Sequence, residues 1–197
     1  MSEEFVGESF TDEDLYGEEI VDRAYVDCTF SDVDLTEAVV RGSTFTDCRF
    51  GNVRFNASRH TDAAFLRCEF TRCVLFEAAF DGCKLTGSTF RECGLRPLTV
   101  SGGDWSFVGL AGADLRGAAF REVRMRETDL GGADLRGTTL AGCDLSGARW
   151  QKSRLEKADL RGSDLTALDP TTAEVRGALI TAEQAVVIAQ ALGLELR

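Results

Sequence analysis

Large apolar residues recur at every fifth position along most of this chain. Counting in fives from Phe5 to Leu165 visits 33 positions, and 32 of them carry Phe, Leu, Val, Ile, Met, Tyr or Trp. His60 is the one exception. A period of five matches neither the period of two of a strand nor the 3.6 of a helix, so it indicates an internal repeat that sets the fold.

A second set of residues, mostly small or β-branched, precedes these large residues by two positions, with Leu98 and Gly103 as the departures. From Cys28 to Ser163 this set is Cys, Ala, Ser, Thr or Val almost throughout, and all seven cysteines of the chain belong to it. The number of cysteines is odd and their spacing lacks the pairing of a disulfide framework or a zinc site. We therefore expect reduced thiols that point into a core.

The other three residues of each unit are mostly polar, charged or glycine, which describes a short extended segment followed by a corner. Four such segments close a four-sided coil of about twenty residues. Successive coils then stack at the ~4.8 Å spacing of neighbouring strands, with the large residues filling the axis. We therefore predict an all-β solenoid, a quadrilateral β-helix without long loops, over residues 23–168.

The N-terminal segment differs from the repeat in its charge. Residues 1–22 hold nine acidic residues and no Lys or Arg, and so supply −9 of the chain's net charge of −11. Glu3, Glu8, Glu13 and Glu18 stand where small residues stand elsewhere. We therefore treat residues 1–22 as a separate acidic segment and expect an irregular or open first coil.

The C-terminal segment, residues 169–197, is predicted to form a cap with a short α-helix. Pro170 takes a large-residue position and cannot continue a ladder. Thr181 and Gln184 make a capping box, and Gly193 provides a helix stop. Because the helix is apolar around much of its surface, we expect it to cover the end of the solenoid and to bind a second copy about a two-fold axis, with capping alone as the alternative. The predicted dimerisation residues are Val186, Val187, Ile188, Ala189, Leu192 and Leu194.

The chain carries no sequence motif for catalysis or cofactor binding. It has no phosphate loop, no dinucleotide glycine motif and no metal-ligand cluster, and no nucleophile is arranged around His60. We predict no enzymatic activity, no catalytic residue, no metal and no cofactor. The absence of a long apolar run or a secretory start predicts a cytoplasmic protein without a membrane partner. The acidic charge disfavours direct binding of nucleic acid.

Several units match a repeat motif of known fold. "GADLRG" at 112–117 and 132–137, "KADLRG" at 157–162 and "GSDL" at 162–165 resemble the pentapeptide repeat proteins, which implies a right-handed quadrilateral β-helix. The Phe-rich first half, the Leu-rich second half, "RECGLRPLTV" and "AEQAVVIAQALGLEL" are similar, more narrowly, to the mycobacterial fluoroquinolone-resistance type. That resemblance implies a DNA mimic that binds DNA gyrase, inhibits it and protects it from fluoroquinolones.

Residues twenty apart stack in such a coil, so carboxylates form columns along the rod. Arginines alternate with them at several levels, which leaves two interpretations: a solvated ladder of opposite charges, or an acidic surface that gyrase binds in place of DNA. Two other functions stay open, a structural interaction module for another partner and an immunity protein against a gyrase-poisoning peptide. The resemblance favours a gyrase-binding surface formed by Asp104, Asp114, Glu127, Asp129, Asp134, Asp144, Asp159 and Asp164.

Overall fold

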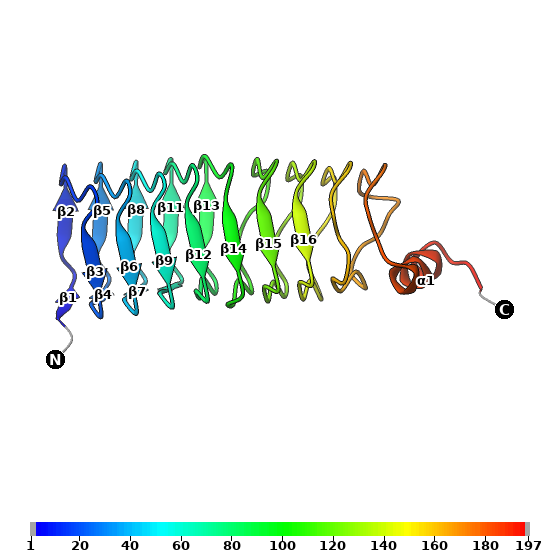
Figure 1. The fold of residues 1–197 in the computed structure, drawn as a ribbon, viewed down its shortest axis with the longest axis horizontal. Coiled ribbons are helices and arrows are strands. Elements are labelled where there is room, and N and C mark those ends of the chain that lie inside the picture. The colour runs from blue at the N-terminus through cyan, green and yellow to red at the C-terminus, as the bar shows by residue number, and fades with distance from the viewer. Residues whose placement is uncertain (1–2, 196–197) are drawn as a thin grey trace.

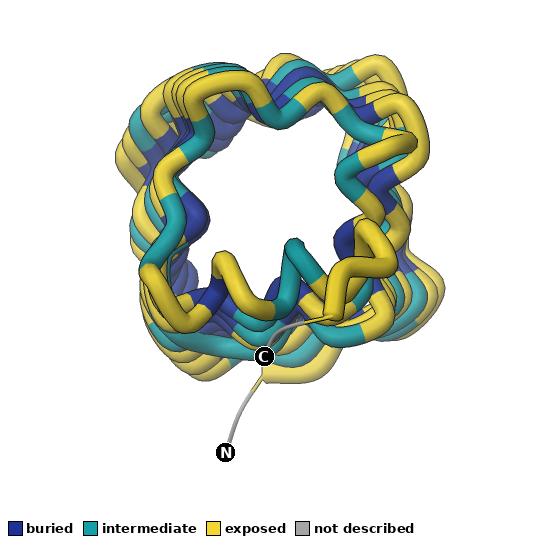
Figure 2. The backbone as a smooth tube through the Cα atoms, turned by 90° about the vertical axis from the view of Figure 1, so that its right-hand side faces the viewer, coloured by how far each residue is buried: buried dark blue, intermediate teal, exposed yellow. Residues whose placement is uncertain are grey.

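The computed structural model describes residues 3–195, which wind into a long rod with a short helix at its C-terminal end (Figure 1). Viewed along the axis, the backbone traces a square (Figure 2). The predicted right-handed quadrilateral β-solenoid with a C-terminal helix is confirmed. Every strand pair and isolated bridge joins residues twenty apart, so each coil has twenty residues and no insertion interrupts the register.

Three sides of the square are parallel sheets built from three-residue strands. The first side contains β1 (Glu4–Val6), β4 (Ala24–Val26), β7 (Thr44–Thr46) and β10 (Ala64–Leu66). The second contains β2 (Ser9–Thr11), β5 (Thr29–Ser31), β8 (Arg49–Gly51), β11 (Glu69–Thr71) and β13 (Thr89–Arg91). The fourth contains β3 (Glu19–Val21), β6 (Val39–Arg41), β9 (Arg59–Thr61), β12 (Ala79–Asp81), β14 (Thr99–Ser101), β15 (Ala119–Arg121) and β16 (Thr139–Ala141). The third side is held by isolated bridges such as Asp14 to Asp34 and Arg54 to Val74.

Most corners have a left-handed residue two positions after a large residue; Pro97 and Ala167 are exceptions. Asp27, with φ of 55°, and Gly112, with φ of 69°, are examples. Gly, Asp, Glu and Asn take most of these positions because glycine has no Cβ to clash and Asn and Asp are the side chains that adopt this conformation most readily. Gly103 is required for another reason: a Cβ at this position would lie 2.0 Å from the carbonyl oxygen of Cys83 in the coil below.

The large residues fill the axis as columns of stacked rings. The centroids of Phe50 and Phe70 are 4.8 Å apart and those of Phe70 and Phe90 are 4.6 Å apart, with nearly parallel planes. In-register parallel strands impose this spacing, so a ring at one level favours a ring at the next. All seven cysteines are free thiols, as predicted; six are buried, and Cys93 is half-buried.

The small inward residues also donate hydrogen bonds to backbone carbonyl oxygens. Ser88 Oγ donates to the carbonyl oxygen of Phe65 at 2.8 Å, and Thr138 Oγ1 donates to that of Leu115 at 2.7 Å. Cys68 Sγ makes the same contact with the carbonyl oxygen of Phe45 at 3.3 Å. A short side chain with a donor fits this position because it satisfies a carbonyl 23 residues earlier without filling the axis.

The first coil forms the N-terminal end of the rod. At the N-terminus β1, β2 and β3 pair in register with the second coil, and the large residues Phe5, Phe10 and Leu15 are only partly buried. The first coil thus keeps the register throughout, although we expected it to be irregular or open. The division into segments 1–22, 23–168 and 169–197 stays a prediction.

At the C-terminus α1 (Ala182–Ala191) begins with the predicted capping box between Thr181 and Gln184. Gln184 also anchors the helix to the solenoid, because its Nε2 donates to the carbonyl oxygens of Leu160 and Ser163, each at 2.7 Å. In the coil below, Ser163 Oγ and Asp164 N–H donate to the equivalent carbonyls of Leu140 and Cys143, so Gln184 replaces donors that a further coil would supply. The Arg96–Pro97 peptide bond is cis.

His60 is packed in the axis as a neutral ring. It is 1% exposed and stacks on Phe80 with a centroid distance of 4.3 Å. Ser58 Oγ donates to the carbonyl oxygen of Phe55, so at 2.9 Å it accepts the Nε2 proton of His60, while Nδ1 has no partner. Burial lowers the pKa of His60 to about 3, which means that the fold excludes the imidazolium form.

We predict that His60→Phe removes part of the acid sensitivity of the fold. The pKa of His60 is about 3 in the folded protein and about 6.5 in the unfolded chain. Below pH 6.5 the unfolded chain therefore binds a proton that the folded protein does not, and the free energy of unfolding falls as the pH falls towards 3. The wild-type free energy of unfolding should therefore fall more steeply than that of His60→Phe between pH 6.5 and 4, by up to about 1.4 kcal/mol per pH unit. Chemical denaturation at several pH values measures this difference, and equal slopes would contradict a buried neutral imidazole.

Candidate protein-interaction surface

The structure places the eight predicted gyrase-binding carboxylates on all four sides of the rod. Residues twenty apart stack, and bridges confirm the columns through Asp104, Arg124 and Asp144 and through Asp114 and Asp134. Residues five apart, in contrast, lie on neighbouring sides. The set therefore extends along the C-terminal half of the rod without forming one continuous face. The first side carries Asp104, Glu127, Asp144 and Asp164, the second Asp129, the third Asp114 and Asp134, and the fourth Asp159.

Six of the eight carboxylates form ion pairs with arginines. The arginine comes either from the same coil, two residues along, or from a neighbouring coil. Within residues 3–195 no ion pair involves Glu127 or Asp164; Asp164 instead accepts hydrogen bonds from Thr166. The pairs are Asp104 with Arg124 (3.2 Å), Asp114 with Arg116 (2.8 Å) and Arg96 (3.1 Å), Asp129 with Arg149 (3.7 Å), Asp134 with Arg136 (2.7 Å) and Arg154 (2.8 Å), Asp144 with Arg126, and Asp159 with Arg161 (2.7 Å).

Asp134 is the most strongly engaged of these carboxylates. Its side chain is 9% exposed and contacts Arg116, Arg136 and Arg154. Hydrogen bonding from Arg136 lowers its pKa to about 2. A carboxylate held by three guanidinium groups presents little negative charge to a partner. The third side in this half of the rod is therefore a ladder of paired charges, which was the alternative interpretation of the sequence.

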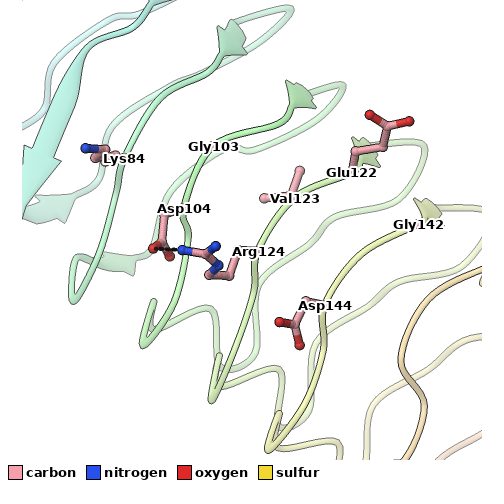
Figure 3. A pocket seen from close by; sticks show the side chains of 8 residues that line it. All are labelled: Lys84, Gly103, Asp104, Glu122, Val123, Arg124, Gly142 and Asp144. Atoms are coloured by element: carbon pink, nitrogen blue, oxygen red, sulfur yellow. Dashed lines mark hydrogen bonds and ion pairs between the residues drawn. The ribbon is translucent and has the colours of Figure 1, made fainter.

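A shallow groove of about 620 Å³ lies on the first side and includes two of the predicted residues (Figure 3). Asp104, Arg124 and Asp144 lie at successive levels along it, and Lys84 lies at one end. Gly103 and Gly142 border the groove and contribute no side chains, which leaves it open. Charges of opposite sign alternate along this column, so the groove has a mixed potential rather than an acidic one.

Most of the net charge lies at the N-terminal end of the rod. Residues 1–37 contain thirteen acidic residues and one arginine, a net charge of −12, whereas the rest of the chain contains twenty acidic and twenty-one basic residues. These acidic residues belong to the first two coils. The described part of this segment makes two ion pairs, Glu3 with Arg23 at 3.3 Å and Asp34 with Arg54 at 2.8 Å. The strongest acidic field of the rod is therefore at the end opposite α1 (Figure 1).

The predicted dimerisation residues divide into two groups. Ile188 packs against the solenoid with Leu168, Val175 and Ile180 around it. Val186, Leu192 and Leu194 are 43%, 50% and 58% exposed. Val187 and Ala189 are intermediate. The helix thus has one side on the solenoid, as predicted for a cap, and leaves three large apolar residues of the predicted set in solvent.

No cluster of three or more potential metal ligands occurs among residues 3–195. No helix in the same part of the chain is long and apolar enough to cross a membrane. The predictions of no enzymatic activity, no cofactor and a cytoplasmic location stay predictions.

Comparison with protein families identifies the class to which the solenoid belongs. A model described as "pentapeptide repeat region" matches residues 70–150, and a model described as "pentapeptide repeats (8 copies)" matches residues 26–59 and 140–169. Together with the square solenoid, these matches show that the chain belongs to the pentapeptide repeat family. A comparison with curated protein sequences gives no match.

Solved structures of QnrB1, described as a plasmid-mediated fluoroquinolone resistance protein, share the fold over the whole chain. Two trypsin-treated variants of QnrB1 are each 22% identical, with TM-scores of 0.76 and 0.70, and the alignments cover 100% of this chain and 99% and 98% of theirs. Full-length QnrB1 is 19% identical with a TM-score of 0.65, and 97% and 100% of the two chains are covered. The narrower similarity to the mycobacterial type stays a prediction.

One feature of the surface was not predicted from the sequence. The neutralisation of Asp114 and Asp134 follows from Arg116 and Arg136, each two residues after its aspartate. The repeated "ADLR" is the signal that could have shown this pairing.

Proposed function

We propose that this protein binds DNA gyrase as a mimic of duplex DNA, inhibits the enzyme and protects it from fluoroquinolones. The observation that carries the proposal is the full-length match in fold to QnrB1, a fluoroquinolone-resistance protein. The net charge of −11 of this chain is consistent with a partner that binds DNA. The contact with gyrase would be electrostatic, because the basic residues of a DNA-binding surface attract carboxylates that are spaced along a rod as phosphates are along DNA.

The dimensions of the rod suit this role. Glu4 and Asp164 lie in one column eight coils apart, which at ~4.8 Å per coil is about 38 Å. Two copies joined at α1 would reach roughly 75 Å, a length comparable with about twenty base pairs of DNA. The exposed Val186, Leu192 and Leu194 support a tail-to-tail dimer, because a monomer in water gains nothing from exposing three large apolar residues so close together.

Within the predicted acidic set, Glu127 and Asp164 are the residues best placed to act on a partner. Neither forms an ion pair within residues 3–195, although Arg126 lies near enough to Asp164 to interact with it electrostatically. Asp134 and Asp159, in contrast, are held by arginines that lower their pKa. We include all eight carboxylates in the proposed contact surface and expect these two to contribute most.

We predict that Val186→Asp yields a monomer with an intact solenoid. Val186 is 43% exposed, whereas Ile188 is the residue of α1 that packs against the core, so a charge at Val186 should mainly oppose association. Light scattering coupled to size-exclusion chromatography measures the mass of the wild type and the variant, and circular dichroism checks the fold. A wild-type protein that is monomeric at every concentration would remove the dimer from the proposal.

We predict that Glu127→Lys with Asp164→Lys weakens inhibition of gyrase supercoiling about tenfold or more, as loss of unscreened charge contacts does. Purified gyrase, with and without a fluoroquinolone, provides the assay. The control is Glu69→Lys with Glu77→Lys, which changes the net charge equally on other sides of the rod.

The outcomes of this assay separate the possible functions. Equal loss in both double variants would indicate a response to total charge rather than to this surface. If the wild-type protein leaves gyrase unaffected in both conditions, gyrase is not the partner, and the alternative of an interaction module for another protein is favoured.

A further inference from the structure

The backbone ladder between coils is interrupted at one place on the third side. The segments 92–97 and 111–116 belong to successive coils and are fully described, yet no backbone hydrogen bond joins them. Pro97 has no N–H to donate, and no bridge connects Gly94 to Asp114 although they are twenty residues apart. The ladder is intact immediately below and above, where Leu75 N–H donates to Gly94 O at 2.7 Å and Leu115 N–H donates to Asp134 O at 2.9 Å.

A cleft of about 510 Å³ opens at this interruption. One coil contributes Phe90 to Cys93 and Leu95, and the next contributes Ala111 to Asp114. The ion pair between Arg96 and Asp114, at 3.1 Å, connects the two coils where the backbone does not. Because the upper coil presents only Ala, Gly and Ala before Asp114, it has no large side chain to cover the cleft.

Cys93 is the thiol that this cleft makes accessible. It lines the cleft and is half-buried, whereas the other six cysteines are at most 2% exposed. Its sulfur lies 3.3 Å from the carbonyl oxygen of Arg91 and 3.5 Å from that of Phe70. A small reagent that enters the cleft therefore meets one cysteine and no other.

A second thiol lies directly beneath Cys93. The pairs Thr71 with Arg91 and Val74 with Gly94 are in register, which places Cys73 and Cys93 at equivalent positions of successive coils. Their Cα atoms are thus at the spacing of adjacent strands, ~4.8 Å, inside the range of about 4.4–6.8 Å that a disulfide spans. Cys73 is completely buried, so it is reached through Cys93 rather than from solvent.

The two thiols have different acidities because they interact. Hydrogen bonding from the Cys73 thiol lowers the pKa of Cys93, and the same contact, together with burial, raises the pKa of Cys73. The thiolate is the nucleophilic form of cysteine, so Cys93 reacts first with an electrophile while Cys73 keeps its proton.

We propose that Cys93 is an oxidation site for peroxides and that Cys73 is its resolving thiol. The Cys93 thiolate attacks a peroxide oxygen and the O–O bond breaks, which gives Cys93 sulfenic acid and, with a proton from water, releases the other oxygen as water or an alcohol. Cys73 sulfur then attacks the sulfenic sulfur, the S–O bond breaks, and the Cys73 proton leaves with the hydroxide as water. The peroxide is reduced by two electrons, and the two thiols become a disulfide across the interrupted ladder.

The chain contains a matched pair that should not react. Cys48 and Cys68 are also twenty residues apart, at equivalent positions of successive coils. They also interact, which lowers the pKa of Cys48 and raises that of Cys68. Both are at most 1% exposed and the ladder around them is unbroken. The two pairs differ in whether a reagent from solvent can reach one of the sulfur atoms, so Cys48→Ser with Cys68→Ser is the control.

The test uses the full-length folded protein and hydrogen peroxide. We expect the wild type to lose two of its seven thiols, counted after denaturation, and peptide mass spectrometry to find a Cys73–Cys93 disulfide. Cys93→Ser should lose none at the same dose. Cys73→Ser should stop at a sulfenic acid that dimedone traps on Cys93, and the control variant should lose two thiols as the wild type does. In the native wild type, iodoacetamide should label Cys93 at least about tenfold faster than any other cysteine.

Three results would overturn the proposal. The first is a wild-type protein that keeps all seven thiols at a peroxide dose that oxidises a free cysteine. The second is a Cys93→Ser variant that loses two thiols as fast as the wild type. The third is a disulfide at Cys48 and Cys68 in place of Cys73 and Cys93. Circular dichroism of each variant excludes unfolding as the cause of any added reactivity.

Discussion

Each coil is held to the next by parallel backbone hydrogen bonds between residues twenty apart, and the rest of the structure depends on this offset being constant. The offset places Phe over Phe at 4.6–4.9 Å in the axis and lets a small residue donate to a carbonyl in the coil below. It also places surface charges in columns, where an aspartate and an arginine at neighbouring levels pair. A repeat of five residues, one side of the square and its corner, keeps this offset constant because four repeats make one coil of twenty residues.

The same constraint explains how far the sequence predicts the fold. A large residue every fifth position is a strong signal because each position must fill the same axis, and the predicted solenoid, inward thiols and capping box of Thr181 and Gln184 are all present. The interruption between segments 92–97 and 111–116 could not be predicted, because the large residues Leu95 and Leu115 keep the period while the backbone between their coils separates. The five-residue period predicts which side chains point inward, but it does not predict whether backbone hydrogen bonds form between two coils.

The surface was less predictable for a related reason. Stacking alone identifies columns of carboxylates, but the charge that a partner meets depends on which arginines reach them. Asp134, which contacts three arginines, and Asp164, which forms no ion pair within residues 3–195, occupy equivalent positions in their repeat units. Uncompensated charge is concentrated in the first two coils, so a partner attracted by charge meets a rod whose field is strongest at the end far from α1.

The most direct test of the constant offset is a comparison of two deletions. Removing residues 44–63 takes out one complete coil and brings Tyr25 under Phe65 and Phe30 under Phe70 with the register unchanged. Removing only Asn52, an exposed corner residue, shifts every later residue by one. Thermal unfolding followed by circular dichroism should show a cooperative transition for the twenty-residue deletion and loss of the folded state, or a much lower midpoint, for the single deletion. A single deletion that is tolerated as well as the loss of a whole coil would contradict the account.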